Sequence, residues 1–457
     1  MTATLKITNP ADGSALAEVA ADDAASVAAK FARARQAQPM WAATPLAERS
    51  AAIRRFRAAV EHELETLART LTQEVGKPLQ QSKNELNGFL GRIDFFLAEV
   101  EKTIAPETVL ADGAMTERID HDPLGVVANV SAWNYPYFVG GNVFVPALLT
   151  GNSVLYKPSE FATLTGLHVE RLLHAAGIPE DVFVVVVGAG DVGAALLAQP
   201  VDGVFFTGSY ATGAKIAAGA GRRMIKVQLE LGGKDPAYVA DDVDVKAAAA
   251  ALADGAFYNT GQSCCSVERI YVHEAVHDAF VAAFVAEVKG YAQGDPLDEK
   301  TYIGAITRKP QLAVLRRQVA DALKKGATLK LGGAPMRRKG NWFAPTVLTD
   351  VDHSMAVMRE ESFGPIIGIQ AVADDDAAVD QMNDTDYGLT AAVYSRDEKR
   401  ARKLLARVDA GTVYWNCCDR VSPRLPWSGV KHSGVGLTLS TYGIQTFTRP
   451  KAWHLKA

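Results

Sequence analysis

The chain has 457 residues, enough for two or three domains of ordinary size. Lys and Arg together number 48 and Asp and Glu 52, so the formal net charge is −4, which argues against nucleic acid as the main partner and against a polybasic membrane surface. No stretch offers about 18 uninterrupted apolar residues, and the N-terminus lacks a signal-peptide pattern, so we expect no membrane span and a cytoplasmic protein.

The first part of the chain is predicted to be helical. Apolar residues recur at spacings of three and four over Ala21–Gln38, Leu46–Glu74 and Leu79–Thr103. Because this part is rich in Ala and lacks Tyr, we expect a packed helical cover rather than part of a functional site. The polar stretch Ala105–Asp122 that follows is predicted to be extended.

From Gly125 onward, short apolar strands alternate with helical stretches, which is typical of a parallel sheet with crossover helices. A second alternating series follows residue 264, so the predicted fold class is α/β. Strands are expected at 125–133, 151–159, 181–190, 201–209, 268–274 and 328–333, and helices at 164–176, 192–198, 275–291 and 311–325. The alternating tail 448–457 is predicted to be a terminal strand, which must pair, with another subunit's sheet as one candidate.

Two glycine patterns suggest a phosphate site, and they differ in strength. The run Gly188–Gly193 matches G-x-G-x-x-G, but residues 205–217 offer no acidic partner for a ribose, so a tight turn is the favoured interpretation. Gly208 and Ser209 end a strand and precede a helix, whose first backbone amides can hold a pyrophosphate.

The cysteines form two adjacent pairs, Cys264 with Cys265 and Cys417 with Cys418. Zinc sites separate their cysteines by two to four residues so that two thiolates converge on one ion, and adjacent pairs do not give that spacing. We therefore predict no metal site. In a reducing compartment a cysteine is more often catalytic than part of a structural disulfide.

Several polar side chains are predicted at strand ends or in adjoining turns. Asn134 follows one strand, Glu230 ends a short strand that runs into two glycines, and Cys264 follows a Gly-Gln turn. Glu361 and Phe363 lie in a further strand–turn segment. A carboxylate, an amide and a cysteine so placed are the parts that covalent acyl chemistry needs.

These segments resemble the NAD(P)-dependent aldehyde dehydrogenase superfamily, from "NPADG" near the N-terminus to "SGVGLTLSTYGIQTFTRPKA" near the C-terminus. Two motifs are highly specific. One is "LELGGKDP", which contains Glu230, and the other is "GQSCCSVER", which fits F-x-x-x-G-Q-x-C-x-x-x-x-R from Phe257 to Arg269 and selects Cys264 as the nucleophile. "WNYP", "LYKPSE", "FFTGS" and "EESFGPI" add support.

The resemblance implies a mechanism for the three catalytic candidates. The Cys264 thiolate attacks the aldehyde carbon, and the Asn134 amide and the Cys264 backbone N–H stabilise the oxyanion. Hydride leaves for the nicotinamide, a thioester remains on Cys264, and Glu230 activates the water that hydrolyses it. Cys265 is then interpreted as a small packing residue.

The resemblance also implies a dinucleotide site. Lys157 and Glu160 would bind the adenosine ribose, Gly208 and Ser209 would lie at the pyrophosphate, and Glu361 would bind the nicotinamide ribose. Glu160 would repel a 2′-phosphate, which favours NAD, but some relatives with this glutamate accept both cofactors, so NADP stays open. The cofactor-binding candidates are Trp133, Lys157, Ser159, Glu160, Gly208, Ser209, Glu361 and Phe363.

The substrate is less well indicated. Trp427 stands where the family usually has Phe, which suits an apolar or aromatic aldehyde or serves only packing. Relatives that act on succinic semialdehyde often carry Arg eight residues after the catalytic asparagine, where this chain has Asn142. Arg420 and Arg424 are candidate substitutes, although such loop arginines are more often solvated.

Trp427, Cys265 and Asn416 are the substrate-pocket candidates. Cys417 and Cys418 follow Asn416 in the family's substrate-side loop, and packing is the favoured interpretation for both. The alternative is a reversible disulfide with Cys264 under oxidation.

Hydrolytic aldehyde oxidation has rivals in other classes. An acylating, coenzyme A-dependent enzyme would generally lack the glutamate, so Glu230 argues against it. A binding or structural role would not need Asn134, Glu230 and Cys264 together, and a cysteine hydrolase would need a histidine partner. Within hydrolytic oxidation, succinic semialdehyde is an alternative specific substrate.

The resemblance implies a three-part fold. Residues 1–105 and 124–231 would form a Rossmann-type NAD-binding domain, and residues 232–432 an α/β catalytic domain. Residues 106–123 and 433–457 would form a small β element that bridges subunits, which implies a homodimer or a homotetramer.

Overall fold

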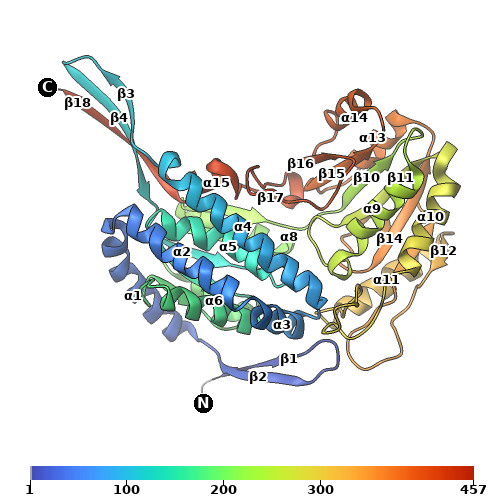
Figure 1. Ribbon diagram of the computed structural model, residues 1–457, viewed down its shortest axis with the longest axis horizontal. Coiled ribbons are helices and arrows are strands. Elements are labelled where there is room, and N and C mark those ends of the chain that lie inside the picture. Colours follow the sequence, from blue (N-terminus) through green and yellow to red (C-terminus); the bar gives the residue numbers. More distant parts are fainter. Residues whose placement is uncertain (1–2, 457) are drawn as a thin grey trace.

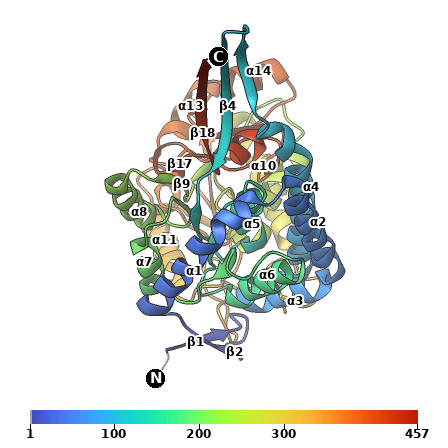
Figure 2. The same ribbon diagram turned by 90° about the vertical axis from the view of Figure 1, so that its left-hand side faces the viewer.

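The computed structural model describes residues 3–456, and in it two helix-covered β-sheets lie side by side (Figure 1). A small antiparallel sheet projects from one end of the molecule, and an N-terminal hairpin lies at the opposite end (Figure 2). Residues 1, 2 and 457, the outermost parts of the predicted first and last segments, lie outside the described residues.

The N-terminal helices are α1 (Ala24–Ala43), α2 (Leu46–His62), α3 (Leu64–Val75) and α4 (Leu79–Thr103). A capping box between Asp23 and Ser26 starts α1 three residues later than expected. The single helix predicted over Leu46–Glu74 is wrong, because the chain turns at Glu63, where φ is −97° and ψ is 11°. Hairpin β1 (Thr4–Thr8) and β2 (Ala15–Ala20) was not expected.

The first large sheet has six strands in the order β17-β9-β8-β5-β6-β7, all parallel except β17. Alternate side chains point to opposite faces, so Val127 packs with α2–α6 while Val126 and Ala128 pack with α1, α7 and α8. The strands are β5 (Val126–Val130), β6 (Ser153–Lys157), β7 (Phe183–Val185), β8 (Gly203–Thr207), β9 (Lys226–Glu230) and β17 (Gly434–Val435). Its helices are α5 (Pro136–Leu149), α6 (Thr163–Ala175), α7 (Gly190–Ala198) and α8 (Tyr210–Arg223).

The order of the first sheet locates a ligand site. β5 lies between β6, the next strand along the chain, and β8, so the crossovers depart in opposite directions. In an open parallel sheet, such a reversal leaves a crevice at the carboxyl ends of the strands. The segment from Ser131 to Asn134 leaves β5 at this point, and Glu230 ends β9 beyond β8.

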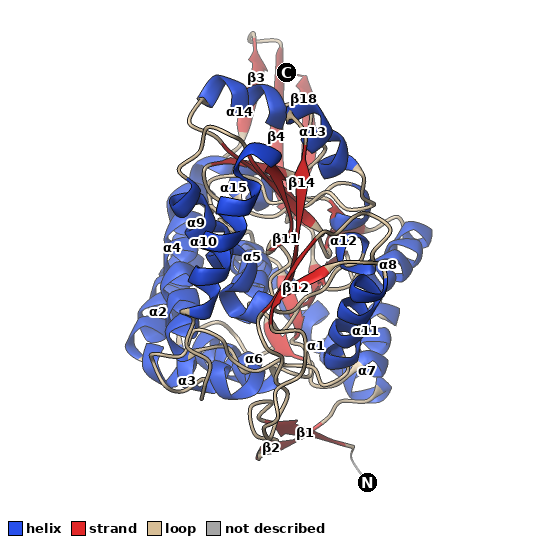
Figure 3. Ribbon diagram, turned by 90° about the vertical axis from the view of Figure 1, so that its right-hand side faces the viewer, coloured by secondary structure: helices blue, strands red, loops and turns tan. Residues whose placement is uncertain are grey.

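The second large sheet has seven strands in the order β12-β13-β14-β11-β10-β15-β16, and only β12 runs antiparallel. Helices cover both faces (Figure 3): Ala237 and Val239 pack with α9 and α10, and Tyr238 packs with the α11–α14 side. The strands are β10 (Asp235–Val239), β11 (Val267–His273), β12 (Thr328–Leu331), β13 (Thr346–Thr349), β14 (Ile366–Val372), β15 (Thr390–Tyr394) and β16 (Thr412–Trp415). The helices are α9 (Val245–Phe257), α10 (His277–Lys289), α11 (Gln311–Lys324), α12 (Ala356–Arg359), α13 (Asp375–Asn383) and α14 (Glu398–Leu405).

These two mainly parallel sheets with helices on both faces confirm the predicted α/β class. The projecting sheet has three strands: β3 (Glu107–Ala111), β4 (Met115–Pro123) and β18 (Thr448–Lys456). β18 pairs along its length with β4 of its own chain, from Thr448 opposite Pro123 to Lys456 opposite Met115. Helix α15 (Ser440–Gln445) precedes β18, and no described helix is long and apolar enough to cross a membrane.

Candidate active site

Cys264 is held by a strained turn between α9 and β11. Asn259 and Thr260 both have positive φ, 51° and 58°, and Gly261 has φ 69°. A Cβ on Gly261 would lie 2.4 Å from the Gly364 carbonyl oxygen, so only glycine fits there. Gln262 fastens the turn, because its Oε1 accepts a hydrogen bond of 2.9 Å from the Thr307 backbone N–H.

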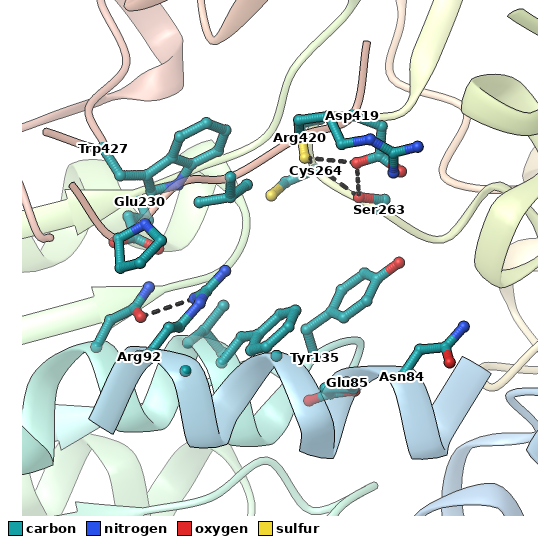
Figure 4. Close-up of a pocket in the computed structure, with 18 of the residues that line it drawn as sticks. Asn84, Glu85, Arg92, Tyr135, Glu230, Ser263, Cys264, Asp419, Arg420 and Trp427 are labelled. Carbon is teal, nitrogen blue, oxygen red and sulfur yellow. Dashed lines mark hydrogen bonds between the residues drawn. The ribbon is translucent and has the colours of Figure 1, made fainter. Parts of the chain in front are cut away.

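Cys264 lies where two cavities meet. The substrate-side cavity, of about 460 Å³, is bounded by one face of α4, the start of α5 and the loop from Asp419 to Trp427 (Figure 4). A second cavity, of about 260 Å³, lies against the ends of β5, β8 and β9 and the turn that contains Phe363, and we call it the nicotinamide-side cavity after the ligand expected there. Among the described residues, only Cys264 and Glu230 line both cavities.

Glu230 has the surroundings of a carboxyl that titrates near neutral pH. It ends β9 and is 4% exposed, and this burial raises its pKa to about 7. The Thr438 hydroxyl and Gln228 Nε2 both donate to its Oε1, the latter at 3.2 Å. Its Oε2 is buried and has no hydrogen-bond partner among the described residues, so that oxygen is free to accept a proton.

Asn134 lies between β5 and α5, against the same turn as Cys264. Its Nδ2 donates to the Gln262 backbone carbonyl oxygen at 3.1 Å, and the Asn134 backbone carbonyl oxygen accepts from Asn259 Nδ2 at 3.2 Å. The first bond holds the side-chain amide, and the second holds the backbone, beside the turn that carries Cys264. Asn134 lines the nicotinamide-side cavity together with Cys264, which is a suitable position for an oxyanion donor.

The far wall of the nicotinamide-side cavity is the turn that carries Glu361 and Phe363. The Glu268 carboxylate accepts hydrogen bonds from the backbone N–H groups of Ser362 and Phe363, and it pairs with buried Lys234 at 2.7 Å. Phe363 has φ 46°, a conformation that these bonds hold in place. Burial, and then the neighbouring Glu268, raise the pKa of Glu361.

A third cavity, of about 940 Å³, lies over the ends of β5, β6 and β8. Lys157 is 4% exposed there, and burial lowers its pKa. Trp133, Gly208, Ser209 and Arg308 also line the nicotinamide-side cavity, so the two cavities are continuous. Ser209 precedes the first turn of α8, with its unpaired backbone amides.

The size and the donors of this continuous space fit a dinucleotide. The Gly188–Gly193 run was interpreted as a turn. Gly188 does form a tight turn, since a Cβ there would lie 2.3 Å from a Val192 methyl carbon, but Gly190 and Gly193 also line the third cavity. Ser159 and Glu160 line it as well, joined by a 3.3 Å hydrogen bond.

The substrate-pocket candidates separate into two groups. Trp427 and Cys265 line the substrate-side cavity, and Cys265 is more than a packing residue because its Sγ donates to Asp419 Oδ1 at 2.9 Å. The placement of Asn416 in the pocket is wrong. Its side chain hydrogen-bonds the backbone N–H and carbonyl oxygen of Ser395, both at 3.0 Å, outside the cavity.

The second cysteine pair does not reach the site. Cys418 packs in the α9–α10 core, where its Sγ accepts from the Tyr394 hydroxyl at 3.3 Å. Cys417 packs against the same cluster, whereas Cys264 packs against the core of the first sheet. Neither Cys417 nor Cys418 lines a cavity that Cys264 enters, so a disulfide with Cys264 is not supported.

The main residues that the sequence analysis missed are on α4, which was expected to be only a packed cover. Gln81, Glu85, Gly88 and Arg92 all line the substrate-side cavity. Their spacings of four, three and four place them on one helix face. A stripe of polar residues and glycine at helical spacing was the available signal.

Known proteins resemble this chain in sequence and in architecture. A model of the aldehyde dehydrogenase family matches residues 1–453. The chain is 35% identical over 444 residues to a Deinococcus radiodurans protein named succinate-semialdehyde dehydrogenase (NADP⁺), covering 97% of this chain and 93% of that protein. It is 32% identical to a chloroplastic betaine aldehyde dehydrogenase of Beta vulgaris, covering 98% and 92% respectively.

Solved structures agree. A lactaldehyde dehydrogenase from Escherichia coli superposes with a TM-score of 0.96 at 30% identity, covering 100% of this chain and 96% of that one. An NAD-dependent aldehyde dehydrogenase from Sinorhizobium meliloti gives a TM-score of 0.96 at 33% identity, covering 99% and 92%. On this fold, this geometry and this similarity, the chain belongs to the aldehyde dehydrogenase family.

Proposed function

We propose that this protein oxidises an aldehyde to a carboxylic acid through a covalent adduct on Cys264. As a family member it is an oxidoreductase that acts on aldehydes with NAD or NADP. The observation that carries the proposed residue roles is that Cys264 and Glu230 are shared by the substrate-side and nicotinamide-side cavities. A nucleophile and a base at that junction reach both the substrate carbon and its hydride acceptor.

Cys264 acts first. As a thiolate it attacks the aldehyde carbon, a C–S bond forms, and the carbonyl electron pair moves to oxygen, where the Asn134 amide stabilises the negative charge. A bound NAD or NADP would supply the acceptor for the hydride that leaves the same carbon. The carbonyl re-forms, and Cys264 holds the acyl group as a thioester.

Glu230 completes the cycle. Its unpartnered Oε2 takes a proton from water, the hydroxide adds to the thioester carbon, and the C–S bond breaks to release the acid and the Cys264 thiolate. Glu230 can take this proton only while its carboxyl is ionised. With a pKa of about 7, a substantial fraction of the carboxyl is ionised near neutral pH.

The cofactor would be held by the residues of the two continuous cavities. Lys157 and Glu160 would bind the adenosine ribose, Gly208 and Ser209 the pyrophosphate, and Glu361 the nicotinamide ribose, with Trp133, Ser159 and Phe363 along the walls. We propose a preference for NAD, because the Glu160 carboxylate would repel a 2′-phosphate.

The predicted division of the chain is part of the proposal. Residues 1–105 and 124–231 would form the NAD-binding domain, 232–432 the catalytic domain, and 106–123 with 433–457 the subunit bridge. The projecting sheet supports a homodimer or homotetramer, because β3 and β18 are edge strands with unpaired backbone groups. We place the protein in the cytoplasm, where its free cysteines stay reduced.

The test is reduced-nicotinamide formation with NAD and NADP in parallel, over aliphatic, aromatic and semialdehyde substrates, with and without coenzyme A. Turnover without coenzyme A that yields the free acid supports the proposal. Turnover that requires coenzyme A would identify an acylating enzyme and refute the role of Glu230.

A further inference from the structure

Arg92 differs from the other buried arginines of the described chain. Arg49 and Arg269 each donate to at least four backbone or hydroxyl oxygens. Arg92 is 4% exposed, yet within residues 3–456 it donates one hydrogen bond, from Nη1 to Asn142 Oδ1 at 2.7 Å, and forms no ion pair. Its other N–H groups have no acceptor among the described residues and face the cavity, so water or a ligand must supply the acceptors.

The Arg92 guanidinium points into the substrate-side cavity (Figure 4). Its Cζ lies 3.7 Å from the centroid of the Phe138 ring, which supports one face of the cation. Asn142, on α5, holds one edge. A flat cation fixed at one face and one edge, with its other N–H groups toward the cavity of Cys264, is preorganised for a planar anion such as a carboxylate.

Three acidic side chains line the same cavity, and among the described residues none of them forms an ion pair or a hydrogen bond with Arg92. The charge of the nearby Glu230 favours the Arg92 cation, but the Glu230 Oε1 accepts its hydrogen bonds from Thr438 and Gln228. Glu85 is engaged by buried Lys77, with which it forms an ion pair. Asp419 accepts hydrogen bonds from Cys265 at 2.9 Å and from Ser263 at 3.4 Å. Two more arginines of the cavity wall lie on its exposed side, Arg420 and Arg424. The cavity is therefore better suited to an anionic than to a cationic substrate.

We propose that Arg92 is the specificity-determining residue of the substrate-side cavity and binds the carboxylate of a short aldehyde that carries a carboxylate at its other end. Cys264 attacks the aldehyde carbon while Arg92 holds the distal carboxylate. This inference rests on the proposed function, because the two ends of one substrate must engage the two residues together. Phe138 and Asn142 are positioning residues for the guanidinium.

The direct test compares two substrates of similar length and different charge, succinic semialdehyde and its neutral methyl ester. For Arg92→Met we expect the ratio of kcat/KM, semialdehyde over ester, to fall about 100-fold relative to the unaltered protein. Arg92→Lys keeps the positive charge but lacks the planar guanidinium group, so its ratio should lie between those of the unaltered protein and Arg92→Met. The control Arg57→Met removes a half-buried arginine of α2 that lies outside the cavity and pairs with Glu61 and Asp94, and it should leave the ratio unchanged.

A charge transplant separates anion binding from general support of the fold. Because Arg92 Nη1 and Asn142 Oδ1 are 2.7 Å apart, the double variant Arg92→Asn with Asn142→Arg returns a guanidinium to nearly the same place from α5. The ratio of kcat/KM, semialdehyde over ester, should be at least tenfold higher in the double variant than in Arg92→Asn alone. Equal loss in the single and double variants contradicts the proposal.

Succinate binding, measured by titration calorimetry, tests Arg92 without any turnover. The unaltered protein should bind succinate about 100-fold more tightly than Arg92→Met, and Arg57→Met should match the unaltered protein. If no aldehyde is oxidised while this difference remains, the proposed function fails and the anion site stands. If Arg92→Met lowers turnover of semialdehyde and ester equally, or if the unaltered protein prefers the ester or an aminoaldehyde, the inference about Arg92 is overturned.

Discussion

The two cavities that meet at Cys264 are built from different parts of the fold. The nicotinamide side is made of backbone turns at the ends of β5, β8 and β9, which topology brings to one edge of a sheet. The substrate side is made of side chains from α4, α5 and the loop from Asp419 to Trp427. Strand-end positions follow from chain order, whereas a helix contributes to a cavity only through the rotation that packing gives it.

Cys264 belongs to both cavities, and its loss has the largest expected effect. Cys264→Ala removes the proposed nucleophile, so reduced-nicotinamide formation should fall by about 10⁴-fold or more. The control Cys417→Ala lies outside both cavities and should keep its rate within about twofold. Steady-state absorbance with a saturating aldehyde measures both. Comparable loss in the two variants would mean that general cysteine removal, not the nucleophile, had been tested.

Glu230→Gln should separate the two half-reactions. Hydride loss precedes the step that needs the base, so one equivalent of reduced cofactor per site should still form in a burst. Turnover after the burst should be slower by roughly 10³-fold. Stopped-flow absorbance resolves the two phases. A variant without a burst would assign Glu230 to activation of Cys264 instead.

Lys234→Met tests the support of the nicotinamide side alone. The substitution leaves Glu268 buried without its cation, which should lower the free energy of unfolding by about 3–5 kcal/mol. Adding Glu268→Gln removes the orphaned charge and should restore part of that stability. Urea unfolding measures both variants. A change below about 1 kcal/mol would show that the pair does not hold the Phe363 turn.

The pH profile reports on the charge of Glu230. Burial raises its pKa to about 7, and the ionised form is the base, so thioester hydrolysis should rise about tenfold per pH unit below 7 and level off above it. Single-turnover hydrolysis of the acylated protein gives this profile. The same measurement on Glu230→Gln should give a flat line, and a persistent slope would assign the titration to another group.

A substitution of Glu160 has the smallest expected effect, which is on the preference between the two cofactors. Glu160→Gln keeps the shape and removes the charge, so kcat/KM for NADP relative to NAD should rise by roughly fivefold to tenfold. Parallel assays with the two cofactors measure the ratio. Substrate preference between semialdehyde and ester should not move, because Glu160 lines only the third cavity.

Most of the fold and the nicotinamide side could be predicted from the sequence. The α/β alternation, the position of Asn134 after β5 and that of Glu230 at the end of β9 depend on local patterns that a single segment contains. The turn before Cys264 carries the same kind of local signal in its Gly-Gln pair. The break between α2 and α3 at Glu63 has no local signal in the sequence. Neither Gly nor Pro stands there, and the apolar residues keep their helical spacing across it.

The substrate side could not be predicted in this way. Arg92 is one of many charged residues on a helix, and only the packing of α4 against α5 turns it toward Cys264. The prediction that Asn416 lines the pocket was wrong because it relied on position in the sequence alone. It lies near Trp427 in sequence, but its positive φ of 54° and its bonds to Ser395 direct its side chain toward β15. Proximity in the sequence predicts where a loop lies, but it does not predict the direction in which each side chain of the loop points.

The hydrogen bonds of Glu268 to the Phe363 turn connect that turn to the segment that carries Cys264. Cys264 and Glu268 are four residues apart, so the thiol and the anchor of the opposite cavity wall are carried by the same piece of chain. We expect a group added to the sulfur to shift this segment and, through Glu268, the Phe363 turn. The Trp133 ring lies 5.5 Å from the Phe363 ring, so indole fluorescence should signal the covalent state of the cysteine before any product is released.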